Sequence, residues 1–187
     1  MVSAKALETR RRITDATVQV MMSRGFPQLT LEEVAKQANV SKGGLLYHFA
    51  SKEELLMGVI EEQEARQFKQ YQEYLDQGLG QMEAFVTLQA NHEEEFHLDI
   101  DTVLFLLSFL KENEAFVEER KKQVNQFFNQ LMESADPVEA MMIRFVLDGL
   151  KMSEHFKFAQ PSKAERQQLV ERLLKRAREI DQASDKE

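Results

Sequence analysis

Four segments of this chain carry the spacing of a helix start, in which a hydroxyl or carboxylate side chain precedes a glutamate by three residues. They begin at Thr30, Ser51, Asp136 and Ser162. In this arrangement the first side chain accepts a hydrogen bond from a free backbone N–H, and the glutamate satisfies a second one. Glycine and proline are scarce, and no stretch shows the alternation of a β-strand. We therefore expect an all-α fold.

Apolar residues recur at helical spacing after each of these starts. The run over residues 101–110 is apolar nearly all round, which is typical of a helix buried at the centre of a domain. About nine helices are expected: residues 4–24, short helices after Thr30 and after Ser41, then 51–77, 81–92, 101–110, 114–133, 136–158 and 162–180.

The charge is distributed unevenly along the chain. Residues 1–52 hold eight lysines and arginines against four acidic residues, while residues 53–187 hold sixteen against twenty-eight. A basic end and an acidic remainder indicate two domains, 1–52 and 53–187, with an anionic partner at the first only. No linker rich in glycine, proline or serine separates them.

The basic domain has the pattern of a helix-turn-helix. Asn39 stands where the chain must turn sharply, and asparagine tolerates the left-handed backbone conformation. Ser41 then caps a short helix whose first turn holds Gly43 and Gly44. Each glycine costs a helix about 1 kcal/mol relative to alanine, but both let another surface approach closely. The second helix of such a motif enters the major groove of DNA, so DNA is the expected partner.

The arginines at the start of the first helix, Arg10, Arg11 and Arg12, oppose the helix dipole. A nearby phosphate backbone and a simple solvated basic end explain them equally well. Leu45 and Phe49 are expected in the core of the small domain.

Several classes of function are excluded or disfavoured. The chain has no cysteine, which excludes a disulfide, a zinc–thiolate site and thiol catalysis. We find no recognisable nucleophile, base and orienting group, so we expect neither an enzyme nor a cofactor. His92 and His97, five residues apart, do not stack on one helical face, and a solvated acidic turn is favoured over a metal site. Without a membrane-spanning run or a signal sequence, the expected location is cytoplasmic.

Eleven of the 13 phenylalanines lie in the acidic domain. Such residues usually form ordinary core, but aromatic faces with nearby carboxylates also suit a lipophilic cation. The candidate ligand-binding residues are Phe105, Phe109, Phe127, Phe145, Glu95 and Asp101.

Residues 9–55 resemble the N-terminal domain of TetR-type transcriptional repressors. The resemblance is carried by T-R-R-R-I-T-D-A-T, R-G-F, T-L-E-E-V-A-K-Q-A-N-V-S and K-G-G-L-L-Y-H-F-A-S-K-E-E-L, in that order. The G-G-L-L-Y-H-F helix and the later run Asp148-Gly149-Leu150 look like one subgroup of the family. The resemblance implies a nine-helix homodimer that binds a palindromic operator and releases it when a small-molecule inducer enters the C-terminal domain.

Position by position, the resemblance places DNA contacts on one short part of the chain. The implied DNA-binding residues, with the cap included, are Thr30, Ser41, Lys42, Gly43, Gly44, Tyr47, His48 and Lys52. The two lysines are expected to neutralise phosphates, or Lys42 to reach a guanine edge. His48 has the alternative of capping or packing against the first helix. Many members have tyrosine where this chain has Leu46, and glycine where it has Asn39.

The resemblance also implies that the last two helices form the dimer interface. Their apolar residues exceed what one domain needs to bury, and the expected interface residues are Leu150, Leu169, Val170, Leu173 and Leu174. A different class of function remains open, namely a helical DNA-binding architectural or protein-recruiting factor without small-molecule control.

Overall fold

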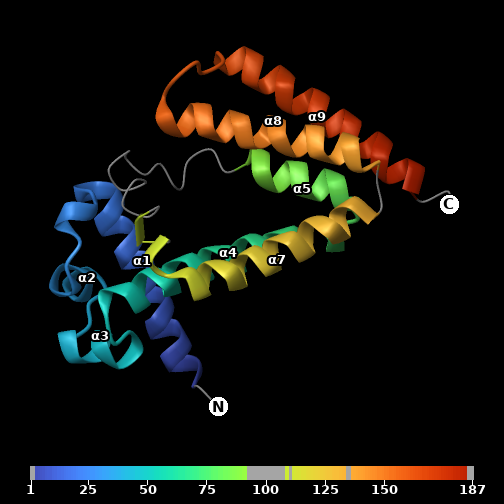
Figure 1. Cartoon of the computed structure of the whole chain (residues 1–187). Coiled ribbons are helices and arrows are strands. Elements are labelled where there is room, and N and C mark those ends of the chain that lie inside the picture. Colours follow the sequence, from blue (N-terminus) through green and yellow to red (C-terminus); the bar gives the residue numbers. More distant parts are fainter. Residues whose placement is uncertain (1–2, 92–107, 110, 134–135, 185–187) are drawn as a thin grey trace. The chain divides into compact units, whose positions relative to one another are not determined.

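The structure, a computed structural model, describes residues 3–91, 108–109, 111–133 and 136–184. These residues form helices and connecting turns without a strand, which confirms the all-α expectation (Figure 1). Their α-helices are α1 (Ala4–Arg24), α2 (Leu31–Gln37), α3 (Lys42–His48), α4 (Lys52–Asp76), α5 (Gln81–Ala90), α7 (Glu114–Glu133), α8 (Pro137–Phe156) and α9 (Lys163–Ser184), and a short 3-10 helix, η1 (Phe26–Gln28), precedes α2. The helix predicted over residues 101–110 lies almost wholly outside the described residues.

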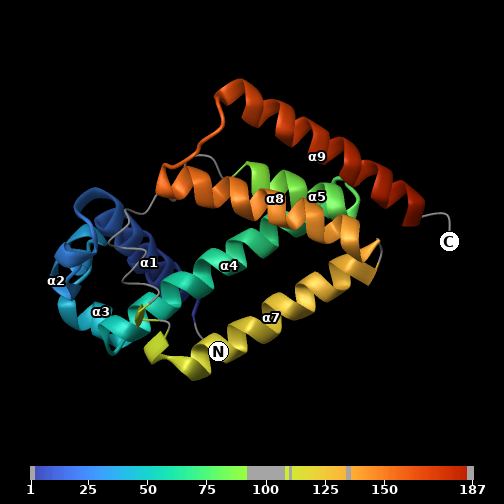
Figure 2. The same ribbon diagram turned by 45° about the horizontal axis from the view of Figure 1, so that its top comes forward.

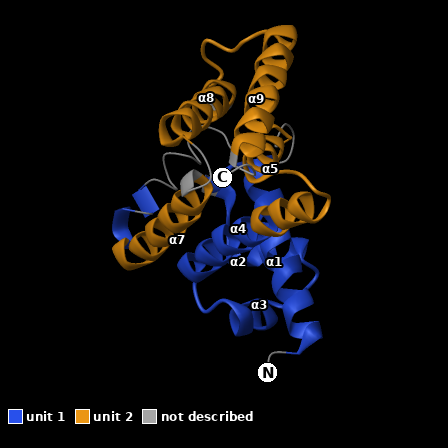
Figure 3. Cartoon of the chain, turned by 90° about the vertical axis from the view of Figure 1, so that its right-hand side faces the viewer, with its two compact units in different colours: residues 1–66, 97–113 blue, residues 67–96, 114–187 orange. Residues whose placement is uncertain are grey.

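The chain divides into two compact units (Figure 3). Unit 1 comprises residues 1–66 and 97–113, and unit 2 comprises residues 67–96 and 114–187. Helix α4 therefore contributes its first fifteen residues, 52–66, to unit 1 and the remainder to unit 2. A domain boundary after residue 52 stays a prediction. None of the described helices is both long and apolar enough to span a bilayer.

The predicted caps start the helices as expected. Thr30 accepts a hydrogen bond from the Glu33 N–H (3.2 Å), and Ser51 accepts one from the Glu54 N–H (3.1 Å). Because caps act within a single turn, their side chains are informative without any tertiary context.

The glutamates of these signatures serve varied partners. Glu165 accepts from the Ser162 N–H at 2.8 Å, which completes the reciprocal arrangement, whereas Glu54 accepts from the Ala50 N–H at 2.9 Å. Glu139 forms an ion pair with Arg176 of α9 at 2.9 Å, and the hydrogen bond from that guanidinium lowers the pKa of the Glu139 carboxyl.

Unit 1 is built around the packing of α1, α2 and α3 with the start of α4. Its most deeply buried apolar side chains are Ile13, Met21, Leu29, Val34, Leu45, Phe49, Leu55 and Leu56. Leu45 and Phe49 are thus core residues, as predicted. Most of these side chains come from four helices, and burying them holds α2 and α3, which are too short to be stable alone, against the rest of the unit.

Unit 2 is organised around α5, which packs against both α8 and α9 (Figures 1 and 2). Buried residues of α5 include Met82, Phe85 and Val86. The N-terminus of α5 has only Gly80 as its own cap, and α9 supplies the missing acceptor. The Asp181 carboxylate accepts hydrogen bonds from the N–H groups of Met82 and Glu83, each at 2.9 Å.

Candidate nucleic-acid interface

The first turn of α3 is capped and open to solvent. Ser41 accepts a hydrogen bond from the Gly44 N–H at 2.9 Å, and Ser41, Lys42 and Gly43 are all exposed. The Lys42 ammonium pairs with the Glu32 carboxylate, and this hydrogen bond lowers the pKa of Glu32. Since both side chains are more than half exposed, the pair is weak in water and leaves Lys42 accessible to a stronger anion.

The fold itself does not require glycine at position 43. Apart from the helix's own backbone and the neighbouring residues, the nearest atom to a Cβ added at Gly43 would be the Ser41 hydroxyl oxygen, 4.0 Å away. At Gly44 the same oxygen would lie 3.2 Å away, which is tight. A glycine that weakens a helix without relieving a clash inside the chain is consistent with close approach by something outside it.

The two faces of α3 differ sharply in exposure. Leu45 is fully buried, whereas Tyr47 is 84% exposed and Leu46 is also exposed. The His48 ring is half-buried and meets the Tyr47 ring edge-on, with centroids 5.2 Å apart. Tyr47 therefore offers a large amphipathic surface to solvent on the side of α3 opposite Leu45.

Thr30 and Lys52 flank α3 at the starts of the neighbouring helices. Thr30 is exposed and caps α2. Lys52 is half-buried, with its ammonium 4.1 Å from the centre of the Phe26 ring, and burial lowers its pKa. The phosphate contact predicted for Lys52 therefore competes with a cation–π contact inside the unit.

The arginines of α1 have partners that sequence reasoning missed. Arg12 donates to the carbonyl oxygens of Ala38 and Asn39, at 2.6 and 3.2 Å, and Arg10 donates to that of His48 at 3.2 Å. Neither the phosphate interpretation nor that of a solvated end included these contacts. The left-handed backbone at Asn39, with φ of 53°, was correctly predicted.

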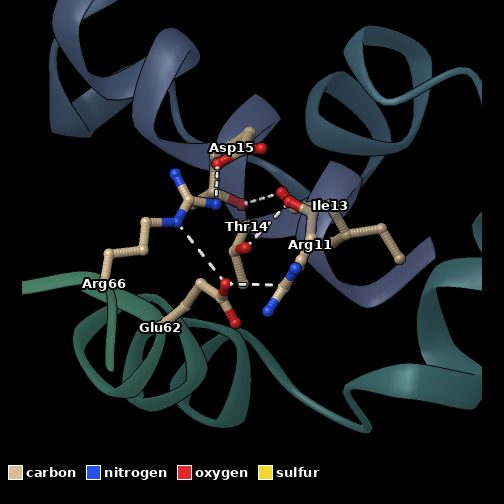
Figure 4. A network of polar contacts seen from close by, with 7 residues as sticks. Arg11, Ile13, Thr14, Asp15, Glu62 and Arg66 are labelled. Carbon is tan, nitrogen blue, oxygen red and sulfur yellow. Dashed lines mark hydrogen bonds and ion pairs between the residues drawn. The ribbon is translucent and has the colours of Figure 1, made fainter. Parts of the chain in front are cut away.

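Arg11 belongs to a separate network between α1 and α4 (Figure 4). It pairs with Glu62 at 3.1 Å, and Glu62 also accepts from Arg66 at 3.4 Å. Arg66 in turn pairs with Asp15 at 2.5 Å. The network joins two helices of unit 1 by their surface side chains, whereas Arg10 and Arg12 reach backbone oxygens.

The predicted ligand-binding residues are spread over both units. Phe105, Glu95 and Asp101 lie outside the described residues, as do His92 and His97. Phe109 is buried in unit 1. In unit 2, Phe127 is partly buried and Phe145 is 62% exposed on α8. Phe109, Phe127 and Phe145 are the candidates that the structure describes, and the ligand site stays a prediction. The described residues contain no group of acidic and histidine side chains suited to a metal ion.

Phe127 belongs to an aromatic cluster of Tyr71, Phe85, Phe127 and Phe128. Its closest rings, Tyr71 and Phe127, pack edge-to-face with centroids 5.2 Å apart. The Arg144 guanidinium lies 3.8 Å from the centre of the Phe128 ring, so the cluster already holds a cation of the chain itself.

The residues predicted for dimerisation are partly used within unit 2. Leu150 and Leu173 are buried, and Leu169, Val170 and Leu174 are half-buried. A further group of exposed apolar side chains lies on another face of α8. We call it the α8 stripe, formed by Val138, Met142, Phe145, Gly149 and Met152. Its members are alternately four and three residues apart, the spacing of a helix–helix seam.

Comparison with known proteins covers both parts of the chain. The family model for bacterial regulatory proteins of the tetR family matches residues 13–59, and that for the tetracyclin repressor-like C-terminal domain matches residues 80–178. An uncharacterized HTH-type transcriptional regulator, TtgW of Pseudomonas putida, is 41% identical over 58 residues, which are 31% of this chain and 43% of that protein. The A-factor receptor protein of Streptomyces griseus is 38% identical over 60 residues, which are 32% of this chain and 22% of the receptor. The chain thus spans less than half the length of these curated relatives.

Among solved structures, a TetR transcription regulator from Haloarcula marismortui ATCC 43049 superposes with a TM-score of 0.66 at 14% identity, covering 95% of this chain and 98% of that one. The multidrug binding protein EbrR complexed with ethidium gives a TM-score of 0.56 at 20% identity, covering 88% and 98%. At these identities the likeness concerns the fold. Because the C-terminal family model alone matches more than half of the chain, the chain belongs to the TetR family of bacterial regulatory proteins.

Proposed function

We propose that this chain is a cytoplasmic, dimeric transcriptional repressor that binds a palindromic operator through α3 and releases it when a small molecule binds. The observation that carries the proposal is the exposed face of α3, where Tyr47 projects into solvent beside the open turn at Lys42 and Gly43. The other face of α3 is anchored in the core by Leu45. A helix held in this way presents fixed side chains to the major groove.

The α8 stripe supports dimerisation. Exposed apolar side chains aligned along one helix mark a surface that a partner covers. Gly149 stands within the stripe, and a Cβ added there would have no atom within 4 Å. A second copy of the chain packing on α8 accounts for both the exposed side chains and the glycine. A dimer that binds a palindromic operator needs its two α3 helices about 34 Å apart, at successive major grooves.

For the small molecule we propose an aromatic cation. Edge-to-face rings such as Tyr71 and Phe127 present negative faces, and Arg144 over Phe128 is a cation bound by this cluster. EbrR, with a similar fold, has been crystallised with ethidium, an aromatic cation. Lys151 favours an anionic ligand instead. Its half-buried ammonium donates to Gln89, and burial lowers its pKa, so an anion would stabilise its charged form.

Selection from a random double-stranded DNA library tests DNA binding. We expect the full chain to enrich an inverted repeat whose half-sites lie about one helical turn apart. Enrichment of no sequence would refute operator recognition. Enrichment without two-fold symmetry would favour an architectural factor instead.

Ethidium and an anionic dye of similar size test the ligand proposal on the selected duplex. Ethidium should raise the melting temperature of the protein without DNA and release the duplex. Phe127→Leu should weaken both effects, whereas release caused by intercalation of ethidium into the duplex would be the same for the variant and the wild type. If only the anionic dye acts, and Lys151→Met abolishes its action, the cationic ligand is refuted. Either result leaves the DNA selection unaffected.

A further inference from the structure

The Arg12 side chain of α1 binds backbone carbonyl groups in the turn of the helix-turn-helix. Its guanidinium Nη2 lies 2.6 Å from the Ala38 carbonyl oxygen and 3.2 Å from that of Asn39. Ala38 is the C-cap residue of α2, and Asn39 has the left-handed φ of 53°. Carbonyl groups at a helix C-terminus lack intrahelical partners and carry its negative charge, so a guanidinium stabilises them in this conformation.

Arg10, on the same helix, holds the other end of α3. It donates to the carbonyl oxygen of His48, the last residue of α3, and its guanidinium lies 4.2 Å from the centre of the Phe49 ring. Glu61 of α4 is 3.6 Å from the same guanidinium. A Cβ on Gly58 would lie 2.3 Å from the Phe49 ring and 3.1 Å from Arg10, so this packing leaves little free space.

We propose that Arg10 and Arg12 are positioning residues that set the orientation of α3 on the operator, and that neither is a phosphate contact. The inference rests on the proposed DNA-binding function. Helix α3 has only seven residues, two of them glycines, so its own hydrogen bonds do not fix it. Arg12 clamps the backbone just before Ser41, and Arg10 clamps the backbone where α3 ends.

Arg11 provides a matched control in the same turn of the same helix. Its side chain is 63% exposed and pairs with the Glu62 carboxylate instead of a helix-turn-helix carbonyl. The experiment compares Arg10→Ala, Arg12→Ala and Arg11→Ala in the full chain. Fluorescence anisotropy measures binding to the selected duplex and to a shuffled duplex over a series of salt concentrations, and circular dichroism establishes that each variant is folded at the assay temperature.

We expect Arg10→Ala and Arg12→Ala each to weaken binding to the selected duplex by about tenfold, as hydrogen bonds to charged groups warrant. Binding to the shuffled duplex and the slope of log K against log salt should stay as in the wild type, because the number of neutralised phosphates is unchanged. Arg11→Ala should bind like the wild type. Arg12→Lys should bind the selected duplex several-fold more weakly than the wild type, because the planar guanidinium holds Nη2 at a fixed angle between the two carbonyl oxygens and a rotating ammonium does not.

Three results would overturn the inference. A salt slope reduced by about 0.9 for each lost contact, with full rescue by Arg12→Lys, would make these residues phosphate contacts. A lower melting temperature with unchanged operator affinity would make their role purely structural. If the wild type selects no duplex, the inference fails together with the proposed function. If the wild type selects a duplex and either of the first two results is found, only the inference about the arginines fails.

Discussion

The cap that α9 supplies to α5 predicts a strong energetic coupling between Gly80 and Asp181. The Asp181 carboxylate accepts two backbone hydrogen bonds at 2.9 Å, and hydrogen bonds to charged groups contribute about 1.5–3 kcal/mol. Losing a cap costs about 0.5–2 kcal/mol. Allowing for rehydration of the freed N–H groups, we expect Asp181→Ala to lower the free energy of unfolding by about 2–3 kcal/mol.

Gly80→Ala should cost a similar amount for a different reason. The new Cβ would lie 2.2 Å from the carboxylate carbon of Asp181, so the carboxylate must move and lose its hydrogen bonds. Once Asp181 is alanine the clash with the carboxylate is gone, although the Cβ of residue 181 still lies 2.5 Å from the new one, so Gly80→Ala should cost less than in the wild type because no hydrogen bonds remain to be lost. The double variant should therefore be more stable than the sum of the single effects predicts, by about 1–2 kcal/mol.

Urea unfolding followed by circular dichroism measures all four free energies. Gln182→Ala, an exposed neighbour of Asp181 on α9, is the control and should be nearly neutral. Additivity of the two single variants within about 0.5 kcal/mol would refute the reasoning, because it would mean that the Gly80 backbone and the Asp181 carboxylate do not meet.

Three further predictions concern other parts of the molecule. Burial, and then the nearby Asp181 carboxylate, raises the pKa of Tyr71 from 10.0 to about 12, so the unfolded chain loses this proton first. The stability that Tyr71 contributes should therefore be lost as the pH rises from about 10 to 12. Over that range the urea midpoint of Tyr71→Phe should fall less than the midpoint of the wild type. Phe145→Glu on the α8 stripe should give monomers in analytical ultracentrifugation, and an unchanged dimer would contradict the proposed interface. Gly58→Ala, whose Cβ would lie 2.3 Å from the Phe49 ring, should destabilise the protein by about 1–3 kcal/mol in urea, and a neutral effect would show that the ring shifts freely.

The sequence predicted those features that depend on neighbours along the chain. Thr30 and Ser51 start helices because a cap needs only the N–H groups of the following turn. Asn39 adopts the left-handed conformation because its own side chain tolerates it. The fold class followed from such local signals combined with helical periodicity.

Features that depend on distant parts of the chain were not predictable in the same way. Arg12 finds its carbonyl partners 26 and 27 residues away, and nothing in the spacing of basic residues distinguishes this from a phosphate contact. Helix α8 has apolar side chains on two faces, and periodicity does not indicate which one the chain covers. The structure buries Leu147 and Leu150 and exposes Phe145.

Operator binding by a Tyr47 variant tests the central claim most directly. The full chain, Tyr47→Ala and the control Met22→Ala, which alters an exposed apolar residue of α1, are titrated with the selected duplex at one salt concentration. We predict that Tyr47→Ala binds at least about tenfold more weakly, the scale of one lost contact in the groove, with an unchanged melting temperature, while Met22→Ala binds like the wild type. Equal affinities of Tyr47→Ala and the wild type would contradict the claim that the exposed face of α3 is the surface that contacts DNA.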